Sequence, residues 1–262
     1  MIKPSFKRNW NGVPIIKDKE IDVIVEQIIT QYNPKLLTNP QAIDIDDFAL
    51  YYLNLKQDFK FLSHCGCIWG MMVFNDTRKV PVYNPELELA EYIEAEEGTI
   101  IIDNTLLDDS TEYRYRSTMA HECGHWIFHK DMFIVNEMQS SLFDEPRELA
   151  IACRSKDIEG QSGRRLVTTN DWIEHHAKYF SAALLMPKSL MEIACHEAKQ
   201  NGLVTTNEAL IRYISRIFEV SPTSARIRIQ QLGLGISNVA VMNRNLFNWN
   251  DLPSRFELIE DF

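Results

Sequence analysis

Two histidines four residues apart, His121 and His125, constrain this chain more than any other feature of its sequence. They lie in the segment Ala120–Trp126, inside a stretch whose pattern predicts a helix over Ser117–His129. Because residues i and i+4 share one face of a helix, both imidazoles can reach a single zinc ion at about 2.0–2.1 Å. Glu122 lies about 100° around the helix from His121, where it can act as a general base on a metal-bound water. The sequence therefore predicts a metal site with two histidine ligands on one helix and a general base beside them.

A catalytic zinc needs a third protein ligand and an open fourth position. We predict Glu174 as this ligand, because it opens a predicted helix, Asp171–Met186, whose small and apolar face can pack against the first helix. Asp171 and Glu174 also have the spacing of a capping box, in which Glu174 would only satisfy a backbone N–H. Other side chains that compete for the ligand role are His129, Asp131, His175 and His176.

Two motifs follow one another in the order found in ImmA/IrrE-type metallopeptidases. Arg116–His125 resembles the arginine-led H-E-x-G-H helix of that family, and Glu174–Pro187 resembles its E-x-x-A-N/D-x-F-A-x-x-L-L-M-P segment. The likeness covers roughly Ala42–Gly235. It implies an intracellular, gluzincin-like zinc peptidase with Glu174 as the third zinc ligand. Members of the family often cleave a helix-turn-helix repressor that is encoded beside them.

One residue departs from the family pattern. Lys178 stands four residues after Glu174, where the family usually has Asn or Asp. A lysine side chain donates hydrogen bonds but cannot accept one. If the family residue orients a metal-bound histidine, another side chain must do so here, or metal affinity falls about 10–100-fold.

The expected mechanism uses zinc to lower the pKa of a bound water to about 7 and to polarise the scissile carbonyl. Glu122 then takes the proton of this water and passes it to the leaving amine. Candidates for stabilising the oxyanion are Tyr113, Arg114, His175, His176 and Tyr179. An extended substrate could add to a sheet edge at Thr99–Asn104 or Ile68–Phe74, although an interpretation as plain sheet core is favoured for both.

The patterning and the resemblance together predict an α+β fold, in which a small, mostly antiparallel sheet packs on a helical zincin-like core, with a C-terminal helical, winged-helix-like segment. Helices are predicted at Asp18–Tyr32, Ile43–Leu53, Ser117–His129, Asp171–Met186, Ser189–Gln200, Asn207–Phe218 and Pro222–Leu232, and strands at Ile68–Phe74, Val80–Tyr83 and Thr99–Ile102. We divide the chain into an N-terminal helical extension (1–40), a metallopeptidase core (41–190), a C-terminal helix-turn-helix-like segment (191–240) and a tail (241–262). The composition of Glu159–Arg165 predicts an exposed loop.

Charge argues against nucleic acid as the main partner. The 27 Lys and Arg residues against 37 Asp and Glu residues give a formal net charge of −10, which repels phosphates. The C-terminal helices are locally basic, however, through Arg212, Arg216, Arg226 and Arg228. DNA contact through these helices is therefore kept as a minor alternative, beside the docking of a protein partner.

The N-terminus and the cysteines predict a cytoplasmic protein. No apolar stretch follows the basic residues of the N-terminus as in a secretory signal, and no apolar run approaches the ~18 residues that a membrane helix needs. The five cysteines are an odd number without a C-x-x-C pair, so all five are predicted to be reduced. They are Cys65, Cys67, Cys123, Cys153 and Cys195.

The sequence therefore favours a zinc-dependent intracellular endopeptidase whose substrate is a protein, with a co-encoded helix-turn-helix repressor as the expected one. A DNA-binding regulator, in which the helix of His121 and His125 is only structural, is one alternative. A catalytically silent relative that binds a repressor or toxin is the other. Metal content and proteolysis of the neighbouring gene product distinguish the three.

Overall fold

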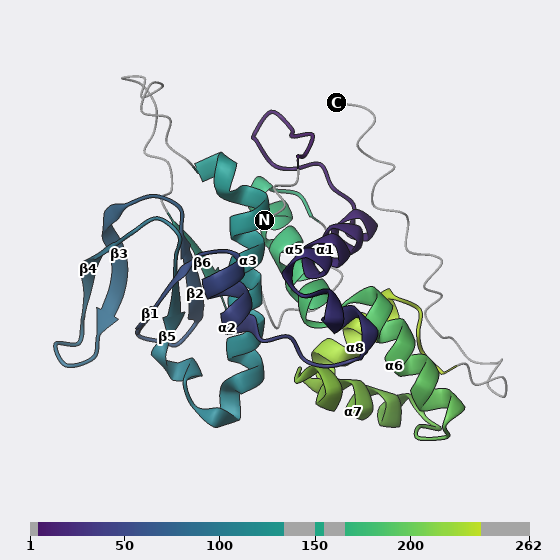
Figure 1. Cartoon of the computed structure of the whole chain (residues 1–262). Coiled ribbons are helices and arrows are strands. Elements are labelled where there is room, and N and C mark those ends of the chain that lie inside the picture. The colour runs from purple at the N-terminus through teal and green to yellow at the C-terminus, as the bar shows by residue number, and fades with distance from the viewer. Residues whose placement is uncertain (1–4, 134–149, 155–165, 237–262) are drawn as a thin grey trace.

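The computed structural model describes residues 5–133, 150–154 and 166–236, and its fold is mixed α/β (Figure 1). Its helices are α1 (Asp18–Tyr32), α2 (Ile45–Asp47), α3 (Glu112–Phe133), α5 (Thr169–Leu185), α6 (Lys188–Gln200), α7 (Asn207–Phe218) and α8 (Pro222–Gln231). Its strands are β1 (Lys56–Lys60), β2 (Ile68–Val73), β3 (Thr77–Asn84), β4 (Leu89–Ala95), β5 (Thr99–Asp103) and β6 (Ala150–Arg154). The predicted loop Glu159–Arg165 and the predicted tail 241–262 lie outside the described residues. No helix in the described ranges is long and apolar enough to cross a membrane.

Within the described ranges, the strands form two small sheets where the patterning predicted one. The larger has the order β1-β5-β2-β6, in which β1 runs parallel to β5 and the other pairs are antiparallel. The smaller is the β3–β4 hairpin. The two segments predicted as substrate-binding edges, Ile68–Phe74 and Thr99–Asn104, hold β2 and β5, which are both internal to the larger sheet. The favoured interpretation of both segments as sheet core is therefore confirmed, and the alternative of a substrate-binding edge is wrong, because β1 and β6, two strands that the patterning missed, cover those edges.

Each face of the larger sheet has its own apolar partner. Because successive side chains of a strand point to opposite faces, Met72 joins the core formed with the helices, whereas Met71 and Val73 join a separate cluster. Val80 and Val82 of the hairpin belong to that second cluster. Figure 1 shows the result: the sheet stands between the hairpin on one side and α3 on the other.

The packing of α3 against α5 depends on small side chains. A Cβ atom at Gly124 of α3 would lie 3.0 Å from the Cα of Ala177 in α5, so the glycine permits a close approach. Ser181 of α5 donates a hydrogen bond to the carbonyl of Ser117 at 3.0 Å. These contacts confirm that the small face of the predicted helix at Asp171–Met186 packs on the helix that carries His121.

The first turn of α5 is capped by Thr168 and Asp171. The Thr168 hydroxyl accepts from the Asp171 N–H at 3.1 Å, and the Asp171 carboxylate accepts from the Thr168 N–H at 2.9 Å. This reciprocal pair is a capping box. The alternative capping box of Asp171 with Glu174 is therefore wrong, and the Glu174 carboxylate is left for another role.

A buried ion pair joins the C-terminal helices to α1. Arg228 of α8 is fully buried and donates to Asp22 of α1 at 2.6 Å. The Tyr179 hydroxyl of α5 donates to the same carboxylate at 2.9 Å, and the Arg228 Nε–H donates to the carbonyl of Met186 at 3.1 Å. We call Asp22, Tyr179 and Arg228 the Asp22 cluster. Arg228 therefore does not belong to a basic surface, and only Arg212, Arg216 and Arg226 of the predicted basic set are exposed.

The expectation of five reduced cysteines is wrong for one pair. The structure joins Cys65 and Cys67 in a disulfide. Gly66 between them has a φ of 62°, and the turn brings the two Cα atoms to 5.3 Å, within the range that a disulfide spans. Cys123, Cys153 and Cys195 are buried and outside any disulfide.

Candidate metal centre

Three side chains from two helices converge between α3 and α5. The Nε2 atoms of His121 and His125 lie 2.9 Å apart. One oxygen of Glu174 lies 3.1 Å from the His121 Nε2 atom, and the other lies 3.7 Å from the His125 Nε2 atom. Both histidines are buried, and the Glu174 side chain is 12% exposed. The structure thus brings the three predicted ligands together, close enough to bind one metal ion.

These separations fit a tetrahedral cation. Ligands at about 2.0–2.1 Å from a zinc ion lie about 3.3–3.4 Å from one another in a tetrahedron. The two Nε2 atoms, at 2.9 Å, and the Glu174 oxygen, at 3.1 Å from the His121 Nε2 atom, are slightly closer than that spacing, and the second Glu174 oxygen lies 3.7 Å from the His125 Nε2 atom. Two neutral imidazoles and one carboxylate would leave a net positive charge on a divalent ion. The residues present therefore fit a metal with one open position.

The charge state of Glu174 suits a ligand. Burial by itself raises the pKa of this carboxyl, but the nearby His125 ring and the hydrogen bond to His121 outweigh burial and hold the pKa well below its usual range. Glu174 is therefore an ionised carboxylate at neutral pH. An ionised oxygen is the form that binds a metal.

Glu122 is the unusual group of the site. Its side chain is fully buried, and neither carboxylate oxygen has a hydrogen-bond partner in the described part of the chain. Burial, followed by the charge of Glu174, raises the pKa of Glu122 well above its usual range. A buried polar group without a partner costs about 1–3 kcal/mol of stability, so Glu122 weakens the metal-free fold that holds it.

Space for Glu122 comes from the strand beneath it. A Cβ atom at Gly70 of β2 would lie 2.8 Å from the Glu122 Oε1 atom and 2.5 Å from Thr118. Any larger residue would push the carboxylate or the helix away from the sheet. Gly70 was not among the predicted site residues, although a lone glycine inside a strand often marks a close approach of this kind.

His129 lies behind a ligand and is not a ligand itself. Its Nδ1 atom is 3.2 Å from the Nδ1 atom of His125. With the Nε2 atom of His125 turned to a metal, its proton is on Nδ1, so His125 donates and His129 accepts. Burial, followed by the charges of His125 and His176, lowers the pKa of His129 well below its usual range and keeps it neutral. His129 thus supplies a hydrogen-bond acceptor for the His125 Nδ1–H, a role that the Lys178 side chain cannot fill.

The other competing ligands lie away from this point. His175 bonds Asp18 of α1 at 2.7 Å, and Asp131 bonds Arg8 at 2.9 Å. His176 is buried, and burial, followed by the charge of His175, lowers its pKa to about 3, so it is neutral at physiological pH. None of these side chains belongs to the metal-ligand group in the described residues.

The candidate oxyanion donors are mostly engaged elsewhere. Tyr179 belongs to the Asp22 cluster, and the ring of His175 bonds Asp18. The Arg114 guanidinium lies over the Trp69 ring, 5.3 Å from its centroid, and Tyr113 is partly exposed beside it. The structure assigns the oxyanion role to none of the five.

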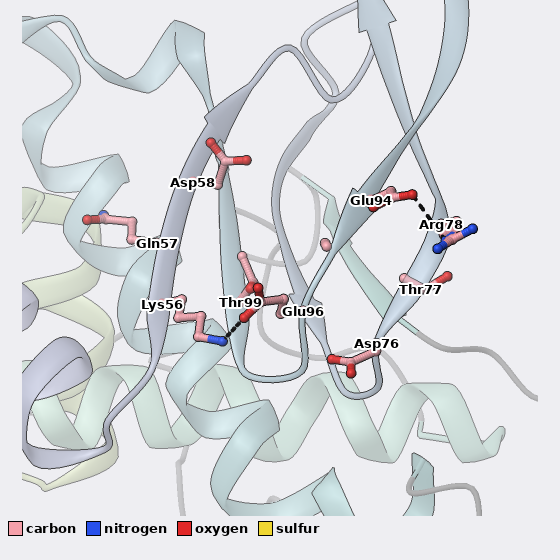
Figure 2. A pocket seen from close by; sticks show the side chains of 10 residues that line it. Lys56, Gln57, Asp58, Asp76, Thr77, Arg78, Glu94, Glu96 and Thr99 are labelled. Atoms are coloured by element: carbon pink, nitrogen blue, oxygen red, sulfur yellow. Dashed lines mark hydrogen bonds and ion pairs between the residues drawn. The ribbon is translucent and has the colours of Figure 1, made fainter.

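A hollow of about 610 Å³ lies on the opposite side of the sheet from α3 (Figure 2). Residues of β1 and β5 form one wall, and the β3–β4 hairpin forms the other. Four of its charged side chains form two ion pairs, Lys56 with Glu96 and Arg78 with Glu94, and Asp58 pairs with Lys60 outside the lining. It contains no histidine and none of the three ligands, so the candidate centre is not in this hollow.

The chain matches no model of a known protein family and no curated protein sequence. A functional assignment therefore stands on the residues and their geometry.

Proposed function

We propose that this protein is a zinc-dependent endopeptidase of the ImmA/IrrE type, with His121, His125 and Glu174 as metal ligands and Glu122 as the general base. The observation that carries the proposal is the convergence of the two imidazole Nε2 atoms and the Glu174 carboxylate at 2.9–3.7 Å. Beside them, Glu122 follows His121 in α3 and has a buried carboxylate without a hydrogen-bond partner among the described residues. A purely structural cluster has no use for such a carboxylate. A metallopeptidase requires one.

The chain's own residues divide the work. Bound zinc, in this donor set, supplies a Lewis acid that polarises a carbonyl and makes water acidic at neutral pH. The buried Glu122 carboxylate takes a proton from the attacking water and gives it to the leaving amine, a contribution typically worth about 10²–10⁴-fold. His129 holds the His125 ring with its Nε2 lone pair toward the ligand point. Gly70 keeps the space that Glu122 occupies.

The proposal extends to the fold and the setting. We interpret α3, α5 and the larger sheet as a zincin-like core and helices α6–α8 as a winged-helix-like appendage, in a cytoplasmic protein. The expected substrate is a helix-turn-helix repressor encoded beside it. The burial of Arg228 removes one of four arginines from the face that would contact DNA, which favours a protein partner over nucleic acid.

The test compares wild type, Glu122→Gln and His121→Ala, with Glu94→Gln as a matched control on the exposed hairpin. Zinc content is measured by elemental analysis, and cleavage is measured on the neighbouring gene's repressor. We expect stoichiometric zinc in wild type, Glu122→Gln and Glu94→Gln, and none in His121→Ala. Cleavage should fall about 10²–10⁴-fold in Glu122→Gln and stay unchanged in Glu94→Gln. Equal cleavage by wild type and Glu122→Gln would refute the assigned base, and zinc without any cleavage would favour the catalytically silent alternative.

A further inference from the structure

Strand β6 brings a thiol to the far side of Glu122. In the pairing of β2 with β6, Cys153 lies opposite Gly70, the residue that makes room for the Glu122 carboxylate. A donor atom of Cys153, one of Glu122 and one of His121 all lie within 4.8 Å of one another. All three side chains are buried, with exposed fractions of 0%, 0% and 1%.

The Glu122 carboxylate points to a ligand at this place. It is fully buried, and neither of its oxygens has a hydrogen-bond partner in the part of the chain that the structure describes. A buried carboxyl group, ionised or protonated, requires a compensating cation or hydrogen bonds. A cation between Glu122, Cys153 and His121 would provide that compensation with donors of three kinds: oxygen, sulfur and nitrogen.

The charges of the two donor sets differ. His121, His125 and Glu174 offer one anion to a divalent ion, which leaves it positive and able to polarise a carbonyl. His121, Glu122 and Cys153 offer two anions once the thiol and the carboxyl have both lost their protons, so a divalent ion there is neutralised. A neutral assembly is the more favourable one in a buried place, but it is a poor Lewis acid. The thiolate also selects for soft cations.

We propose that His121, Glu122 and Cys153 form a second metal position, selective for thiophilic divalent cations, whose occupation stops catalysis by taking Glu122 out of proton transfer. Binding forms bonds from the metal to the Cys153 sulfur and to a Glu122 oxygen, and it releases to solvent the thiol proton and any proton that the Glu122 carboxyl holds. Both sets include His121, so an ion at the second position binds a residue that the first set also uses. The inhibition rests on the proposed function, whereas the binding does not.

The binding test uses cadmium(II), a thiophilic divalent ion, and the ultraviolet charge-transfer absorption of a thiolate–cadmium bond. The starting protein is the full chain with Cys65→Ser and Cys67→Ser, so that this exposed pair cannot contribute. We expect the absorption to rise to one equivalent, with release of at least the thiol proton, and to persist when His125→Ala removes the first set. It should disappear in both Cys153→Ser and Cys153→Ala, two variants that differ in polarity. An absorption that is absent from the starting protein, or that survives both Cys153 variants, overturns the second position.

The activity arm separates this inference from the proposed function. Each variant's cleavage of the repressor is compared with its own rate without cadmium. Inhibition of the starting protein and relief in Cys153→Ala support the inhibitory role, whereas equal inhibition of both overturns it. If no protein cleaves the repressor even without cadmium, the proposed function fails and the charge-transfer result still decides whether the position exists.

Discussion

Two buried polar clusters share helix α5 and differ in how the protein satisfies them. Glu174 contributes to the metal centre beside α3, and Tyr179, about 140° further around the helix, contributes to the Asp22 cluster beside α1 and α8. In the Asp22 cluster, the carboxylate accepts from both Tyr179 and Arg228. In the metal centre, the carboxylate of Glu122 accepts nothing from the described residues.

The difference separates a structural cluster from one that awaits a ligand. Buried polar groups are almost always hydrogen-bonded, so an exception requires an explanation. The Asp22 cluster needs nothing beyond the protein, and its role is to fix α1, α5 and α8 against each other. The candidate metal centre has no such internal partner for Glu122 among the described residues, and under the proposed function a cation and a water would supply it.

The largest expected effect concerns the Asp22 cluster, whose carboxylate has hydrogen-bond partners within the protein. Arg228→Met leaves the Asp22 carboxylate buried without its cation, which should lower the free energy of unfolding by about 3–5 kcal/mol. Urea denaturation measures this loss, and zinc stoichiometry measured in the folded variant should be unchanged. The double variant Asp22→Leu/Arg228→Met should recover most of the stability, since the apolar pair has no charge to bury. A loss below 1 kcal/mol in Arg228→Met would contradict the contrast between the clusters.

The next effect concerns the candidate metal centre. Zinc at a free concentration 100-fold above its dissociation constant should raise the free energy of unfolding by about 2.7 kcal/mol, since only the folded chain assembles the three ligands. Denaturation in the presence of zinc or a chelator measures the gain. Arg228→Met should keep the gain, and His121→Ala, which lacks the residue common to both donor sets, should lose it. The same gain in His121→Ala would place the ion elsewhere.

A smaller effect concerns the orientation of a ligand. His129→Phe removes the acceptor for the His125 Nδ1–H, and zinc affinity should fall about 10–100-fold. Competition with a chelator of known affinity measures the change. His129→Gln keeps an acceptor and should recover part of the affinity, which a purely space-filling role would not produce. Unchanged affinity in His129→Phe would show that His125 is oriented by another group.

The smallest effect is a gain of stability. In the metal-free protein, Glu122→Gln should raise the free energy of unfolding at neutral pH by about 1 kcal/mol, because the amide neither takes up a proton nor buries a charge on folding, although it too lacks a hydrogen-bond partner. The folded-state pKa of Glu122 is raised, so wild type loses stability as pH rises from the ordinary carboxyl pKa toward that raised value. The difference between the two proteins should therefore vanish below about pH 4. Thermal unfolding across this pH range measures it, and a less stable Glu122→Gln at neutral pH would contradict the prediction.

Local patterns in the sequence predicted the helices well. Asp18–Tyr32 and Asn207–Phe218 are predicted and observed with the same bounds, because amphipathic periodicity is a local signal. The pairing of His121 with His125 follows from the same periodicity. Glu174 was only favoured by spacing, and the resemblance, not the local pattern, singled it out as the third ligand.

Long-range contacts were beyond the sequence. Which strands lie at the edges of a sheet depends on pairing between distant segments, so the absence of β1 and β6 from the predicted strands misplaced the edges. The same omission hid Cys153 from the site. The burial of Arg228 depends on Asp22, which is about two hundred residues away in the chain, and no local pattern reports such a partner.

The placement of the ligands on two helices has a mechanical consequence. His121 and His125 belong to α3 and Glu174 to α5, and the strand β6 lies between them in the chain. An ion bound by all three residues would act as a reversible cross-link between α3 and α5, at the two ends of that intervening stretch. Cutting the chain there would leave both halves fastened while the ion stays bound, and a chelator would then weaken the nicked protein more than the intact one.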